Sequence, residues 1–112
     1  MGDEEKKIAK TESLFRDVNE RIAESATAVG LNDAEFVCEC ADPTCTERLS
    51  VELGAYERVR EHSTHFLLAP GHELSARVER VIHRTGEYQV VRKVHDAVVA
   101  IVRRLDPRTD PA

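Results

Sequence analysis

Three cysteines, the whole complement of this 112-residue chain, fall within eight consecutive positions. They are Cys38, Cys40 and Cys45 of the stretch CECADPTC. Thiolates bind zinc and other borderline or soft metal ions, and they also undergo reversible oxidation. An odd number of thiols cannot pair completely in disulfides, so the count favours a metal site or a reduced cluster over a disulfide framework.

A fourth ligand is needed because structural zinc sites are tetrahedral and commonly combine a tight cysteine knuckle with a distant element. The stretch THFLLAPGHE predicts a strand that ends in a turn at Pro70 and Gly71, and His72 follows that turn directly. We therefore predict a structural Cys3His site with zinc as the cofactor. Its predicted ligands are Cys38, Cys40, Cys45 and His72.

Other readings of the same residues stay open. The alternative fourth ligands are His62, His65, His83, His95, Glu39 and Asp42. The spacing C-x-C-x4-C is not one of the common C-x2-C pairs, so the motif is suggestive of a metal site without being diagnostic. The same cysteines could act as a thiol redox sensor. A zinc hydrolase with Glu73 as base is less favoured, because the HE pair lacks a second histidine four residues later and four protein ligands close the site.

Composition limits the classes of function. The formal net charge is -5, with -7 over residues 1–56 and +2 over residues 57–112. This acidity argues against nucleic-acid binding, which depends on clustered basic residues. The charged first ten residues do not resemble a secretory signal, and no apolar run approaches the roughly 20 residues that span a bilayer. We expect a cytoplasmic protein that does not bind membranes.

The elements predict an α+β fold. The stretch TESLFRDVNERIAESATAVG has a helical period and ends at Gly30, which predicts a long N-terminal amphipathic helix. Its expected buried stripe is Ile8, Leu14, Phe15, Val18, Ile22, Ala26 and Val29. EFVCEC alternates, so Phe36, Cys38 and Cys40 are expected on one face of a strand. The turn ADPT and the strand ERLSV complete a cysteine knuckle.

The rest of the chain completes one domain over residues 1–112 with an antiparallel sheet. ELGAYERVREH predicts a short helix, and ARVERVIHRTGEYQVVRKV predicts two strands joined at Thr85 and Gly86, although its first arm also fits a helical turn. HDAVVAIVRRLD predicts a C-terminal helix that ends before Pro107. Residues 1–10 and 106–112 are expected to be flexible tails. Several basic residues are expected on one solvated face of the hairpin: Arg77, Arg80, Arg84, Arg92 and Lys93.

The chain also resembles a known group. LFRDVNERI, AEFVCECADPTCTERL, YERVR and FLLAPGHE are similar to a family of small, functionally uncharacterised proteins of actinobacterial type, with the resemblance running from about Leu14 to Lys93. It implies that the CxCx4C and PGHE motifs belong to one constellation and implies no activity. Together with the motifs it predicts a small zinc-binding protein that serves as an interaction or regulatory module. The N-terminal helix would contact a protein partner or a second copy of the chain.

Overall fold

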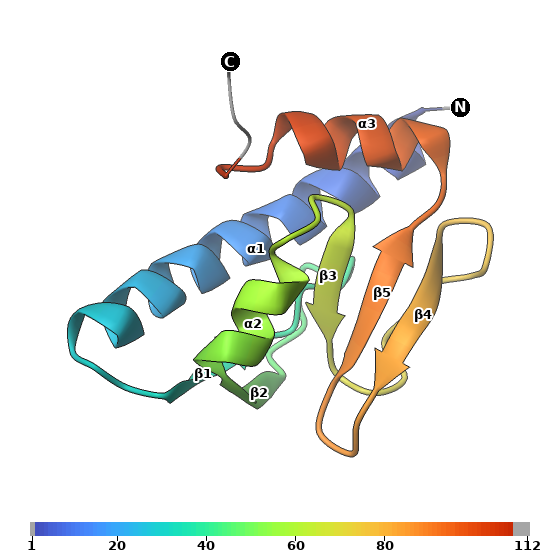
Figure 1. Cartoon of the computed structure of the whole chain (residues 1–112). Helices are drawn as coiled ribbons and strands as arrows, with labels where there is room; N and C mark the ends of the chain where they lie inside the picture. The colour runs from blue at the N-terminus through green and yellow to red at the C-terminus, as the bar shows by residue number, and fades with distance from the viewer. Residues whose placement is uncertain (1, 109–112) are drawn as a thin grey trace.

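The structure is a computed structural model that describes residues 2–108. Its fold is α+β, with a long N-terminal helix, a C-terminal helix and antiparallel sheets (Figure 1). The helices are α1 (Asp3–Ala28), α2 (Leu53–Val59) and α3 (Asp96–Arg104). The strands are β1 (Asp33–Val37), β2 (Arg48–Glu52), β3 (His65–Leu68), β4 (Glu79–Arg84) and β5 (Gln89–Lys93).

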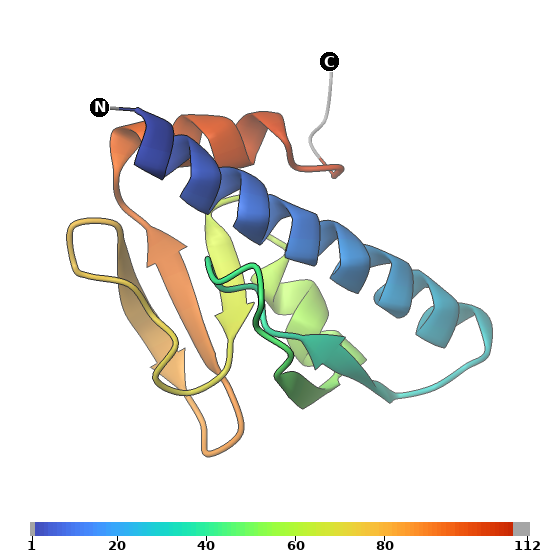
Figure 2. The ribbon, with the colours of Figure 1, turned by 180° about the vertical axis from the view of Figure 1, so that it is seen from behind.

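The strands form two sheets in place of the one expected. β1 pairs with β2, and the second sheet has the order β3-β5-β4. The ambiguous arm before Thr85 is a strand, because β4 pairs with β5 along its length around an irregularity between Val81 and His83. Figure 2 shows α1 running across the molecule, with α3 beside its first half. The apolar core between these layers includes Phe36, Tyr56, Phe66, Leu67 and Val91.

The expected apolar stripe of α1 does not mark its buried side. Leu14, Val18 and Val29 are 62%, 39% and 71% exposed, although Ala26 is buried and other members of the stripe are half-buried. The fully or nearly fully buried positions include Glu12, Ser13, Arg16 and Asn19. The helix is therefore rotated toward a polar side, where Glu12, Arg16 and Asn19 contact partners inside the fold.

The buried arginine of α1 is held by backbone oxygen atoms. Arg16 donates from its two terminal nitrogens to the carbonyls of Ser63 and Val102, each at 2.7 Å. Its guanidinium also lies 4.7 Å from the centre of the Phe66 ring. These contacts join α1 to the segment before β3 and to α3, so a single charged side chain links three elements.

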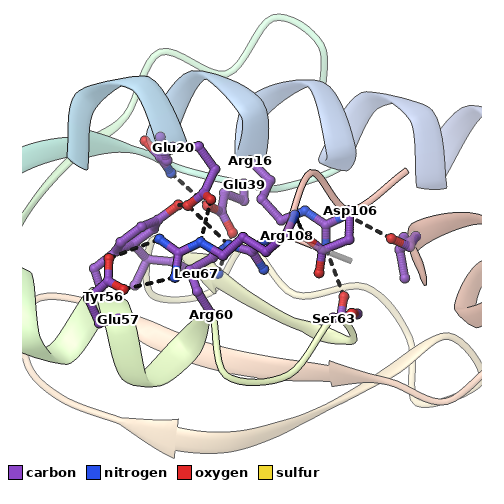
Figure 3. Close-up of polar contacts among 12 residues, drawn as sticks. Arg16, Glu20, Glu39, Tyr56, Glu57, Arg60, Ser63, Leu67, Asp106 and Arg108 are labelled. Carbon is purple, nitrogen blue, oxygen red and sulfur yellow. Dashed lines mark hydrogen bonds and ion pairs between the residues drawn. The ribbon is translucent and has the colours of Figure 1, made fainter. Parts of the chain in front are cut away.

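A second buried arginine follows α2. Arg60 pairs with Glu20 of α1 and with Asp106 beyond α3. Glu20 also accepts a hydrogen bond from the Tyr56 hydroxyl at 2.7 Å. In Figure 3 these groups meet between α1 and α2, beside Arg108. Buried charges are stable only when they are paired and hydrogen-bonded, and the network meets this condition for both carboxylates.

Lys93, one of the basic residues of the hairpin, points into the interior of the protein. Arg77, Arg80, Arg84 and Arg92 are exposed, but Lys93 is buried and pairs with Glu12 and Glu79. Two carboxylates thus share one ammonium. Burial raises the pKa of Glu12 to about 7, although Lys93 opposes the shift. Several of the basic residues are thus solvated as expected, but Lys93 is not one of them, because alternation along β5 points it toward α1.

The expected tails include residues that belong to a helix or are buried. α1 begins at Asp3, and Ala9 is fully buried, so residues 3–10 belong to the helix. At the other end Asp106 is buried, and Arg108 makes a two-point ion pair with Glu57. Residues 109–112 of the expected C-terminal tail lie outside the described residues.

Candidate metal centre

The first half of the site is a loop between β1 and β2. β1 ends at Val37, earlier than the alternation predicted, but the Cys38 amide still donates to the Glu47 carbonyl at 3.2 Å. The Cys45 amide donates to the Asp42 carbonyl at 3.0 Å, which closes a β-turn. The Asp42 carboxylate accepts from the Thr44 amide at 2.9 Å and fixes this turn. The turn places Cys45 back beside the start of the loop.

The second half of the site is a turn after β3. The His72 amide donates to the Ala69 carbonyl at 3.1 Å, and Gly71 lies between them with φ of 83°. Proline at the second position and a glycine with positive φ at the third are typical of a type II turn. The predicted Pro70-Gly71 turn is confirmed, and it delivers His72 to the cysteines.

Two backbone contacts hold the halves together. The Glu39 amide donates to the Leu67 carbonyl at 2.8 Å, and the Ala69 amide donates to Cys38 Sγ at 3.1 Å. An amide that donates to sulfur favours a thiolate over a neutral thiol, since it places a partial positive charge against the negative atom.

The four predicted ligands converge. Their ligand atoms all lie within 4.8 Å of one another. His72 Nδ1 lies 3.6 Å from Cys38 Sγ and 3.7 Å from Cys45 Sγ. A tetrahedral zinc, with bonds of about 2.3 Å to sulfur and about 2.0 Å to nitrogen, separates such atoms by about 3.5 Å. The Cys3His cluster is therefore compatible with a metal-binding site.

The surroundings of the cluster favour neutral thiols over thiolates at Cys38 and Cys40. Cys38 and Cys40 are buried, whereas Cys45 and His72 are half-buried. Burial raises the pKa of both the Cys38 and the Cys40 thiols, and the neighbouring sulfurs add to the effect at Cys38. A bound cation reverses this balance, because it stabilises the thiolates that burial disfavours.

The carboxylates considered as alternative ligands make other contacts. Asp42 is engaged in its turn with Thr44. Glu39 is fully buried, accepts from the Leu67 amide and the Asn19 side chain, and has its pKa raised by burial to about 7. Glu39 thus anchors the loop to β3 and α1. The sequence does not reveal this role, because alternation places Glu39 on the face opposite the cysteines, where a carboxylate is expected to be exposed.

The other histidines also lie elsewhere. His95 accepts from the Ala97 amide at 3.2 Å and caps α3. His62 and His65 lie against each other, with ring centres 4.4 Å apart, and His83 packs near Tyr88. Among the described residues His72 is the histidine that joins the cysteine cluster.

The neighbouring Glu73 is not part of the cluster. Its Oε1 accepts a hydrogen bond from Gln89, which lowers the pKa of the carboxyl, and its Oε2 pairs with Arg84 at 3.8 Å. These contacts commit both oxygens to the β4–β5 hairpin. The geometry therefore offers no support for Glu73 as a base at a metal-bound water.

No family model, curated protein or solved structure matches the chain. The resemblance to the actinobacterial-type family accordingly stays a prediction. Among the helices of residues 2–108, none combines the length and apolar character needed to cross a membrane.

Proposed function

We propose that this protein binds one zinc ion in a closed, structural Cys3His site and acts as a small interaction or regulatory module in the cytoplasm. The observation that carries the proposal is the convergence of four ligand atoms from two separate turns within 4.8 Å. Their sulfur–nitrogen distances of 3.6 and 3.7 Å suit tetrahedral coordination.

Zinc is the metal that this donor set favours. Three thiolates and one imidazole suit zinc, whereas Mg²⁺ and Ca²⁺ prefer oxygen ligands. Four protein donors complete a tetrahedron and leave no position for a reactive water, which is the pattern of structural sites. Free cysteines in a clustered arrangement also suit a reducing, cytoplasmic compartment.

The role proposed for the metal is to fix one part of the fold to another. The loop after β1 contacts the second sheet through a backbone hydrogen bond from the Glu39 amide to the Leu67 carbonyl. Zinc would join the β1–β2 loop to the turn after β3 and so hold this small sheet in place. The exposed Val18 of α1 and the exposed Val29 and Leu31 that follow the helix line one surface, which supports an interaction role because exposed apolar patches mark contact surfaces.

The deciding experiment is elemental metal analysis of untagged protein purified without chelator, alongside His72→Ala and the matched control His83→Ala. We expect about one equivalent of zinc in the parent and in His83→Ala, and weaker retention in His72→Ala during dialysis against a competing chelator. Cobalt substitution of the parent should give the intense thiolate charge-transfer bands of a sulfur-rich site. A parent protein without metal, or equal retention in His72→Ala, would contradict the proposal.

A second candidate function uses the same cysteines as a redox sensor. The proximity of the three sulfurs favours it, since metal loss would leave thiols close enough to form a disulfide after modest movement. Mild hydrogen peroxide should then release zinc and form one intramolecular disulfide that a thiol reductant reverses. Zinc that stays bound under peroxide, with all three cysteines still reduced by mass spectrometry, would exclude this role.

A further inference from the structure

A groove runs between the second half of α1 and β1. Its volume is about 580 Å³. The apolar residues that line it are Val18, Ile22, Ala26, Val29, Leu31 and Ala34. Three of these residues, Val18, Val29 and Leu31, are among the exposed large hydrophobic residues of the described chain. The groove therefore contains apolar surface from α1 and from the segment after it that is not buried in the core.

One wall of the groove is the free edge of a strand. β1 pairs with β2 alone among the described residues. The ladder continues beyond β1 at both ends, where the Leu53 amide donates to Asn32 and the Cys38 amide donates to Glu47. Hydrogen-bonded pairs alternate in an antiparallel ladder, so residues 32, 34, 36 and 38 bond toward β2. The backbone groups of Asp33, Glu35 and Val37 therefore point to the opposite edge.

The side chain of Asn19 confirms that direction at one end. Its Nδ2 donates to the Val37 carbonyl and its Oδ1 accepts from the Val37 amide, each at 2.8 Å. One amide side chain thus supplies the two hydrogen bonds that a neighbouring strand would supply. Asn19 therefore occupies the outward-pointing backbone groups of Val37. Among the described residues, the corresponding groups of Asp33 and of Glu35, which lines the groove, have no strand partner.

We propose that this groove binds an extended segment of a partner protein, which adds to β1 as a third, outer strand. The backbone groups at Asp33 and Glu35 supply the hydrogen bonds, and the apolar side of α1 supplies the contact area. A residue of the partner segment that pairs with Ala34 has its side chain on the same face of the sheet as Ala34. That side chain therefore contacts the apolar residues of α1. The residues before and after it lie opposite the two carboxylates.

This geometry specifies the chemistry of the partner segment. It alternates basic and apolar residues, with the basic residues facing Asp33 and Glu35. The net charge of -7 over residues 1–56 also favours a positively charged partner segment. Arg21 also lines the groove, but it stands on the α1 wall and not on the strand edge.

A second copy of the chain fits this edge poorly. Antiparallel pairing of two β1 strands about Ala34 would place Asp33 of each copy opposite Glu35 of the other. Pairing about Glu35 would place two Glu35 side chains opposite each other and would need the Val37 groups that Asn19 already occupies. Like charges directly opposite destabilise a strand pair, so the edge selects against its own sequence.

The inference rests on the interaction role in the proposed function and names its surface and partner class. Metal content and peptide binding are measured separately, so either can fail alone. Full zinc occupancy without peptide binding would overturn the inference and leave the zinc site standing. Peptide binding by a protein that holds no metal would overturn the zinc site and leave the inference standing.

The test uses the blocked peptide GKVKVKG, titrated into the ¹⁵N-labelled full-length protein and followed by NMR. The amide signals of Ala34, Glu35 and Val29 should shift together. N-methylation of the peptide amides that face β1 should weaken binding at least about tenfold, because it removes hydrogen bonds and retains charge and apolar area. The reordered peptide GKKKVVG should bind similarly weakly, since it loses the alternation.

Two variants distinguish binding in the groove from non-specific binding of the peptide to the protein surface. Val29→Asp should weaken binding of GKVKVKG at least about tenfold, because it places a charge on the apolar wall. Ile82→Asp, at an exposed apolar residue of β4 outside the groove, should bind as the parent does. Equal binding of the N-methylated peptide would overturn the strand-addition geometry. Sedimentation that shows a dimer disrupted by Val29→Asp, without peptide binding by the parent, would assign the groove to a second copy and overturn the proposal.

Discussion

Two regions of this molecule join distant parts of the chain in different ways. The Cys3His cluster joins two turns and brings together three thiols and one imidazole, which are donors that bind soft or borderline metal ions. The charged network around Arg16, Arg60 and Lys93 joins α1 to other elements in the interior, with Arg16 bonded to backbone carbonyls and with Arg60 and Lys93 in ion pairs. Figure 3 shows Arg16 and Arg60 among their partners. In the proposed function the first region depends on a bound cation, whereas the second carries its own cations. Removal of zinc from the cluster, or substitution of a cationic side chain in the network, should therefore lower the stability of the fold. Only the removal of zinc can be reversed, by adding the metal back.

The largest effect is expected from removal of the metal. Treatment with a strong chelator should lower the free energy of unfolding by on the order of 5 kcal/mol, because binding free energy at a structural site is also folding free energy. Thermal unfolding followed by circular dichroism measures the change, and zinc added back should restore the parent curve. Cys40→Ser should show most of the same loss before any chelator is added. An unchanged melting temperature after verified metal removal would show that the cluster does not stabilise the fold.

The two regions also differ in how far the sequence predicted them. Both turns at the cluster were predictable, because Asp42-Pro43 and Pro70-Gly71 have local turn preferences that act over four residues. The charged network was not, since Arg16 bonds a carbonyl 86 residues away and charged side chains are exposed by default. For the same reason the buried side of α1 was assigned to aliphatic residues such as Leu14 and Val18. A helical period shows which residues share a side, but the partners across the core decide which side is buried.

The next largest effect is expected from Arg60→Met. The substitution leaves the carboxylates of Glu20 and Asp106 without their buried partner, which typically costs about 3–5 kcal/mol. Urea denaturation gives the free energy of unfolding. Arg58→Met, at an exposed position in the last turn of α2, serves as control and should stay within about 0.5 kcal/mol of the parent. Zinc content should be unchanged in both, and a loss below about 1 kcal/mol for Arg60→Met would show that the charged network adds little stability.

A smaller effect, visible only as a pH dependence, is expected from Glu12→Gln. The pKa of Glu12 in the folded protein is about 7, raised from 4.5 by burial, so the charged form is disfavoured in the folded state. The free energy of unfolding should therefore fall as the pH rises from about 4.5 to above 7, by on the order of 2–3 kcal/mol from this group. Glutamine is neutral throughout, so the variant should be more stable than the parent at pH 8 and should lose less stability with rising pH.

The measurement for Glu12→Gln is urea denaturation at several pH values between 5 and 8.5. Glu4→Gln, at an exposed position on the same helix, controls for the change in net charge and should track the parent. The difference between parent and variant isolates Glu12 from other titrating groups. Parallel curves for parent and Glu12→Gln would show that Lys93 keeps Glu12 charged, which would make this pair a permanent ion pair in the folded protein.

The smallest effect tests the turn that carries His72. Gly71 has φ of 83°, where an L side chain is strained, and a Cβ there would meet no atom within 4 Å. Gly71→Ala should therefore cost about 1–2 kcal/mol from backbone strain alone. Gly86→Ala, at another open position but without positive φ, should be neutral or slightly stabilising, because it only restricts the unfolded chain. If the zinc site is fixed by its turns, Gly71→Ala should also release zinc to a competing chelator faster than Gly86→Ala does. Equal release would mean that the metal holds His72 in place regardless of the turn, so that the cluster organises the backbone instead of being organised by it.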